Sequence, residues 1–176
     1  TGPFMAAGPL MDSSGWKSLR VPAAQMTARR GKGLSAITAG QDSQTAWIAN
    51  REALLTDGLP AIGRLGTVVR ISEVATHSAE ESSERPIQAC REVLYSVDAA
   101  HEAIRLTPGI SSSGVAAIAA IGDGRLLVLE ASRAPAMPRF RNRLFVIDPD
   151  ATCRGRADLE AVQVDGDQIA KKSMIW

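Results

Sequence analysis

Three carboxylates are the side chains best suited to do chemistry in this sequence. Glu52 and Glu130 each end a short apolar run, and Asp57 follows Glu52 in a loop that contains Gly58. Carboxylate oxygens are the ligands that calcium prefers, and a bound cation can hold a phosphate or polarise an ester. We therefore predict Glu52, Asp57 and Glu130 as metal ligands and calcium as the candidate cofactor, while the catalytic residues stay unknown.

A structural role for the same carboxylates is the competing interpretation. Glu52 and Glu130 would then cap strands and pair with basic side chains, for which the sequence offers Arg51, Arg125 and Arg133. Ion pairs of this kind need no bound ligand. Both interpretations are open at the level of the sequence.

The residue types that support nucleophilic catalysis are present but not in a recognised pattern. His77 and His101 are the two histidines, and neither has the spacing of a metal site or a catalytic triad. The run Ser111-Ser-Ser-Gly114 lacks the Gly-x-Ser-x-Gly pattern of a nucleophile elbow. We interpret these serines as turn hydroxyls.

The elements that must position these residues are predicted to be strands. After an irregular segment over residues 1–15, apolar residues come in short bursts bounded by Gly, Asp, Ser and Pro, which is typical of strands and tight turns. This pattern predicts an all-β fold for residues 16–176. The expected strands are Gly33–Thr38, Thr45–Asn50, Gly66–Val74, Gln88–Val97, Gly114–Ile121, Arg125–Ala131, Arg143–Asp148 and Gln168–Ile175.

A weak internal repeat groups these strands in fours. Gly33-Leu-Ser-Ala-Ile is echoed by Gly114-Val-Ala-Ala-Ile, and each is followed by a turn and three further strands. The strand after the turn ends in Glu52 in the first unit and in Glu130 in the second, so we expect these glutamates to occupy equivalent places in the repeat. Two units of this kind, about 33–97 and 114–175, are typical of successive propeller blades. Because propellers close with typically about four to eight blades, we expect a fragment of a larger propeller.

Several stretches of the chain resemble the esterase-like phytase family. They are Gly33-Leu-Ser-Ala-Ile, Trp47-Ile-Ala-Asn-Arg-Glu-Ala-Leu-Leu-Thr-Asp-Gly58 and Gly122-Asp-Gly-Arg-Leu-Leu-Val-Leu-Glu-Ala-Ser132. The resemblance implies a β-propeller and possible hydrolysis of phosphate or carboxylic esters. The chain departs from the family pattern at Lys32 and around Gly114, where the family usually has glutamates.

Composition and charge exclude some partners and leave the cellular location open. The net charge of +1 gives no field that would gather nucleic acid. No run of about 18 apolar residues is present, so we expect no membrane partner, and no signal peptide is recognisable. Cys90 and Cys153 could form a disulfide or stay as buried thiols. The family resemblance favours the disulfide and an extracytoplasmic, periplasmic or secreted protein.

Three functional hypotheses follow from these observations. The first is a hydrolase of phosphate or carboxylic esters with a small-molecule substrate. The alternatives are a non-catalytic binding β-propeller and a degenerate, truncated copy. In each case the open blade faces would be covered by the rest of the propeller or by another chain.

Overall fold

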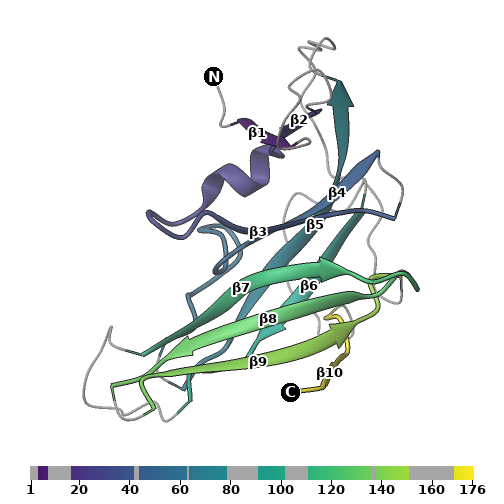
Figure 1. The fold of residues 1–176 in the computed structure, drawn as a ribbon. Helices are drawn as coiled ribbons and strands as arrows, with labels where there is room; N and C mark the ends of the chain where they lie inside the picture. Colours follow the sequence, from purple (N-terminus) through teal and green to yellow (C-terminus); the bar gives the residue numbers. More distant parts are fainter. Residues whose placement is uncertain are drawn as a thin grey trace.

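The computed structural model describes residues 4–7, 17–41, 44–62, 64–78, 91–101, 111–135, 138–150 and 169–176. Within them the chain forms two antiparallel sheets (Figure 1). The first contains β1 (Phe4–Ala7), β2 (Lys17–Arg20), β3 (Leu34–Ala39), β4 (Thr45–Asn50), β5 (Thr67–Ser78) and β6 (Arg91–Val97). The second contains β7 (Ser112–Ala120), β8 (Leu126–Arg133), β9 (Phe140–Ile147) and β10 (Lys172–Met174).

Each sheet contains a four-stranded meander in which every strand pairs with the next along the chain. We call β3–β6 blade 1 and β7–β10 blade 2. This arrangement confirms the expected all-β, propeller-like fold with two four-stranded blades. The turn between β7 and β8 contains Gly124, whose φ of 89° is a conformation that glycine adopts without a steric penalty.

Side-chain alternation explains why these segments form strands that are buried between layers. In β8, Leu126, Val128 and Glu130 are buried, while the residues between them are half-buried. In β5, Val69 and Ile71 are fully buried. Alternate residues of a strand point to opposite faces, so each blade presents one set to each side.

The main hydrophobic core lies between the two blades. Blade 1 contributes mainly from β4, β5 and β6, and blade 2 from β7, β8 and β9. The large side chains in this layer include Trp47, Ile71, Tyr95, Leu126 and Ile147. Removal of this apolar surface from water is what holds the two sheets face to face, at about 25 cal/mol per Å².

The innermost strands of the blades, β3 and β7, also meet directly. The Ser35 hydroxyl donates a hydrogen bond to the Val115 carbonyl at 2.8 Å, and the Ala120 amide donates to the Thr38 hydroxyl at 3.2 Å. A Cβ on Gly114 would lie 2.4 Å from the Arg51 carbonyl oxygen, so this close approach requires glycine.

A β-bulge at the same place in β3 and β7 shows that the blades are equivalent units. The pairing register shifts between Leu34 and Ala36 in blade 1 and between Val115 and Ala117 in blade 2. These residues occupy matching positions in the sequence repeat. Because a bulge bends a strand and changes its twist, its recurrence fixes the same curvature in both units.

Blade 1 is covered on its other side by the segment before β3. This segment contains the 3₁₀ helix η2 (Ala23–Thr27), and Val21 packs on a second apolar cluster of Ala46, Ile48 and Val74. The face that η2 covers in blade 1 is equivalent to the face of blade 2 that packs on blade 1. The N-terminal segment therefore takes the place of a preceding blade.

The strands β1 and β2 and the 3₁₀ helix η2 were not predicted from the sequence. The strands β1 and β2 form a hairpin that extends the far end of β5, through pairs such as Leu19 with Thr76. The strand β1 lies inside the segment 1–15 that we expected to be irregular. Short strands of this kind carry little periodicity, so their existence depends on the edge that β5 offers.

In the described residues, no helix is long and apolar enough to cross a membrane.

Candidate functional site

Glu130 lies at the centre of a polar cluster between the blades. Its side chain is fully buried and accepts hydrogen bonds from the Tyr95 hydroxyl at 2.7 Å and the Lys172 ammonium at 2.8 Å. The Arg143 guanidinium lies 3.2 Å away, directly across the β8–β9 pair. Glu130 therefore joins β6, β8, β9 and β10 through one carboxylate.

The two cations around Glu130 share a further carboxylate. Asp98 lies 2.6 Å from the Lys172 ammonium and 3.2 Å from the Arg143 guanidinium. Lys172 also lies over the rings of Tyr95 and Phe145. Burial, followed by the negative charge of Glu130, raises the pKa of Tyr95, so its hydroxyl stays protonated and donates to the carboxylate.

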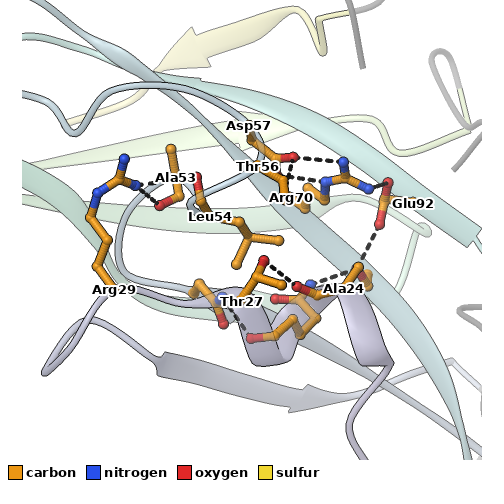
Figure 2. A network of polar contacts seen from close by, with 12 residues as sticks. Ala24, Thr27, Arg29, Ala53, Leu54, Thr56, Asp57, Arg70 and Glu92 are labelled. Carbon is orange, nitrogen blue, oxygen red and sulfur yellow. Dashed lines mark hydrogen bonds and ion pairs between the residues drawn. The ribbon is translucent and has the colours of Figure 1, made fainter. Parts of the chain in front are cut away.

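Asp57 lies in a second buried cluster, on the side of blade 1 that η2 covers. Figure 2 shows the Arg70 guanidinium between Asp57 and Glu92. Arg70 donates to both oxygens of Asp57, at 2.6 and 2.7 Å, and to Glu92 at 3.1 Å. All three side chains are 4% exposed. Asp57 thus receives a bidentate arginine contact, the strongest form of carboxylate pairing.

Burial and charge act in opposite directions on this second cluster. Burial lowers the pKa of Arg70, but its hydrogen bonds and its attraction to Asp57 and Glu92 outweigh that effect and raise it. Burial first, and then the negative charge of Asp57, raise the pKa of Glu92, and together they outweigh the lowering by Arg70 and the Ser72 hydroxyl. Glu92 is therefore the member of the cluster whose charged form is disfavoured by the fold.

Glu52 begins the loop that leads to Asp57. It lies just beyond β4, is buried, and forms a 2.7 Å ion pair with the half-buried Lys32. Arg29 holds the same loop by donating to the carbonyls of Ala53, Leu54 and Gly58. The loop is therefore fixed at both ends by cations from outside it.

The expectation that Glu52 and Glu130 occupy equivalent places in the repeat is wrong. The residue just before each bulge pairs with Asn50 in blade 1 and with Glu130 in blade 2. Asn50 is therefore the counterpart of Glu130, and Glu52 is the counterpart of Ser132. The positions of the bulges, which set the pairing register, cannot be recognised in the sequence, whereas the two glutamates can.

Basic side chains lie beside all three predicted metal ligands. Their partners are Lys32, Arg70, Arg143 and Lys172 and not the arginines that the sequence suggested; Arg125, for example, pairs with Asp123. Among the described residues, no three His, Cys, Asp or Glu side chains gather into a possible metal site. Glu52, Asp57 and Glu130 each lie beside a different cation. Cys90 and Cys153 lie outside the described residues.

One pair of potentially reactive side chains was missed by sequence reasoning. The imidazole Nδ1 of His101 lies 2.6 Å from the Ser132 hydroxyl, and its Nε2 lies 2.6 Å from the Pro138 carbonyl oxygen. His101 follows β6 and Ser132 lies in β8, 31 positions apart. No local motif links them, and only the packing of the blades brings them together.

A comparison with protein-family models relates this chain to a known family. The family model Phytase-like, described as esterase-like activity of phytase, matches residues 12–175. Searches of curated proteins and of solved structures found no significant match. The all-β fold with two successive four-stranded blades agrees with the propeller type of this family. Since the match spans nearly the whole sequence, the chain belongs to the Phytase-like family.

Proposed function

We propose that this protein hydrolyses phosphate or carboxylic esters. The single observation that carries the proposal is the match of residues 12–175 to a family described by its esterase-like activity.

The test is turnover of two ester classes by the purified chain. Release of phosphate from phytate and of the phenol from a simple aryl ester would be measured with added calcium and with a chelator. We expect hydrolysis of at least one substrate. A folded protein that hydrolyses neither would contradict the proposal.

The role of Glu52 can be tested against a closely matched carboxylate. Glu52 pairs with Lys32 at 2.7 Å and Glu73 pairs with Arg91 at 2.6 Å; the acids are 6% and 8% exposed and the bases 34% and 37%. If Glu52 serves the reaction, Glu52→Gln lowers turnover and Glu73→Gln does not. Equal effects of both substitutions would assign Glu52 a structural role.

Calcium is a separate proposal that rests on the sequence. Under it, calcium raises the thermal unfolding temperature of the wild-type chain, and Glu52→Gln weakens that effect. The ion pairs of Glu52, Asp57 and Glu130 oppose it, because a metal would have to displace Lys32, Arg70 or Lys172. An unfolding temperature that calcium leaves unchanged would exclude this site.

A non-catalytic binding propeller is the second candidate. The same ion pairs favour it, since side chains that neutralise one another serve a scaffold well. Here Glu52→Gln leaves binding of a partner intact and no ester is hydrolysed. The two candidates are therefore separated by the turnover assay.

The outer face of blade 2 suggests where a partner would bind. Ala117 and Ala119 are exposed there, beside the half-buried Leu127 and Leu129. This face is equivalent to the one that blade 1 buries against blade 2, so we propose that a further blade or another chain covers it. Sedimentation should show self-association that Ala119→Glu reduces and that Ala23→Glu, on η2, does not.

An extracytoplasmic location is proposed from the family relationship. It predicts that Cys90 and Cys153 are oxidised to a disulfide. Mass spectrometry after thiol blocking, with and without a reductant, would detect that bond. Two blocked thiols in the natively produced protein would contradict it.

A further inference from the structure

The contacts of His101 determine which of its ring nitrogens carries the proton. The Pro138 carbonyl oxygen can only accept a hydrogen bond, so the 2.6 Å contact requires a proton on Nε2. In the neutral ring, Nδ1 is then an acceptor, and its 2.6 Å contact requires the Ser132 hydroxyl to donate. The lone pair of the imidazole is therefore aimed at the proton of Ser132.

This arrangement has the three parts of an activated nucleophile. A hydroxyl lies within hydrogen-bond reach of a base, and a third group orients that base. The Ser132 hydroxyl also lies 3.3 Å from the Arg141 carbonyl oxygen, which competes with His101 for its single proton. The contact with His101 is the shorter of the two, so the proton is placed on the line to Nδ1.

Two residues on the strands that flank Ser132 have a buried polar atom without a hydrogen-bond partner among the described residues. Ser113 lies directly opposite Ser132 in the β7–β8 pair, is 1% exposed, and its hydroxyl has no partner. The Nε of Arg143, two positions along β9 from the partner of Ser132, is also buried and unpaired. A buried polar group without a partner is destabilising, so each of these atoms would gain from an acceptor that a bound substrate could supply.

We propose that Ser132 is a nucleophile and His101 its general base, and that they act on small carboxylic esters. Ser113 and Arg143 supply donors for the oxyanion. This inference rests on the proposed ester hydrolysis and deepens it by naming the residues and the acyl class. Ser132 is 2% exposed and His101 is 7% exposed, so we expect only small acyl groups to reach the hydroxyl.

The reaction proceeds in two steps. Ser132 Oγ forms a bond to the ester carbonyl carbon while its proton passes to His101 Nδ1, and the carbonyl oxygen becomes the oxyanion. Collapse of this intermediate breaks the bond to the alkoxy oxygen, which leaves with the proton from His101. Water then attacks the acyl-serine, gives a proton to His101, and releases the acid while Ser132 regains its hydrogen.

The experiment uses p-nitrophenyl acetate with the purified full chain and three variants. Ser132→Ala removes the nucleophile and His101→Gln removes the base. Ser112→Ala is the matched control, because it removes a hydroxyl from the residue next to Ser113, on the opposite face of β7. Circular dichroism and thermal unfolding confirm that each variant is folded.

We expect p-nitrophenol release and one acetyl group on Ser132, found by peptide mapping of rapidly quenched protein. His101→Gln should slow acetylation of Ser132 about 100-fold or more, the usual contribution of a general base. Ser132→Ala should abolish the acetylated peptide, and Ser112→Ala should retain both the peptide and the rate.

The results separate this inference from the proposed function. Hydrolysis of the aryl ester that persists in Ser132→Ala, or acetylation of a different residue, overturns the inference and leaves ester hydrolysis standing. A folded wild-type chain that hydrolyses no ester and carries no acetyl group overturns both.

Discussion

The equivalent faces of the two blades contain polar clusters of opposite design. On blade 2 a buried anion, Glu130, lies between the cations Lys172 and Arg143. On blade 1 a buried cation, Arg70, lies between the anions Asp57 and Glu92. Arg70 and Arg143 occupy the same position on the third strand of each blade. Arg70 lies two residues before the residue that pairs with Ile48 in blade 1, and Arg143 lies two residues before the residue that pairs with Val128 in blade 2.

The comparison shows that an arginine at the same strand position can be buried in two different electrostatic environments. Arg143 faces another blade and shares its carboxylates with Lys172, which is 17% exposed. Arg70 faces η2 and a loop, and it is the single cation between two carboxylates that are each 4% exposed. Loss of Arg70 leaves more uncompensated buried charge than loss of any one member of the other cluster.

The largest effect is expected from Arg70→Met. It leaves Asp57 and Glu92 buried without their cation, which should lower the free energy of unfolding by about 3–5 kcal/mol. Urea unfolding followed by circular dichroism measures this. Arg125→Met, at an exposed pair with Asp123, is the control and should unfold at the wild-type urea concentration. A loss below about 1 kcal/mol for Arg70→Met would break the comparison.

A smaller loss is expected from Glu130→Gln. The amide keeps the shape and can still accept from Tyr95, while Lys172 and Arg143 keep Asp98 as a partner. We expect the free energy of unfolding to fall by about 1.5–3 kcal/mol, typical of a lost hydrogen bond to a charged group. The same urea titration checks it, and a loss larger than that of Arg70→Met would reverse the order of the two clusters.

Lys172→Met should have a smaller effect again. Its apolar chain can still lie over the rings of Tyr95 and Phe145, and Glu130 keeps its contacts with Arg143 and Tyr95. The lost ion pair and cation–π contact should lower stability by about 1 kcal/mol. Combining Lys172→Met with Glu130→Gln in a double-mutant cycle measures how strongly the two side chains are coupled.

The smallest effect is a pH dependence at Glu92. Its folded pKa is raised above the ordinary 4.5, so the folded chain binds more protons than the unfolded chain above that pH. Stability relative to Glu92→Gln is therefore highest below pH 4.5 and falls as the pH rises through the folded pKa. The slope is at most about 1.4 kcal/mol per pH unit. Urea unfolding of both proteins across this range checks it, and a difference that grows with pH would contradict it.

Local patterns in the sequence determined the strands and their grouping. The strand Thr45–Asn50 was predicted with its observed ends, and both four-stranded units followed from the repeated Gly-Leu-Ser-Ala-Ile pattern. Alternation, turn residues and repeats are properties of neighbouring residues, so they can be read without a structure. Glu52 and Glu130 contact basic side chains, as the structural interpretation of the sequence expected, while their role as metal ligands with Asp57 stays a prediction.

Only the tertiary structure decided which side chains meet. Glu130 contacts Tyr95 from 35 positions away and Lys172 from 42, and Ser132 meets His101 across 31. The true counterpart of Glu130, Asn50, became visible only through the bulges that set the register. Contacts between sheets depend on how whole faces pack, and that packing minimises exposed apolar area over many residues at once. No short stretch of sequence contains this information.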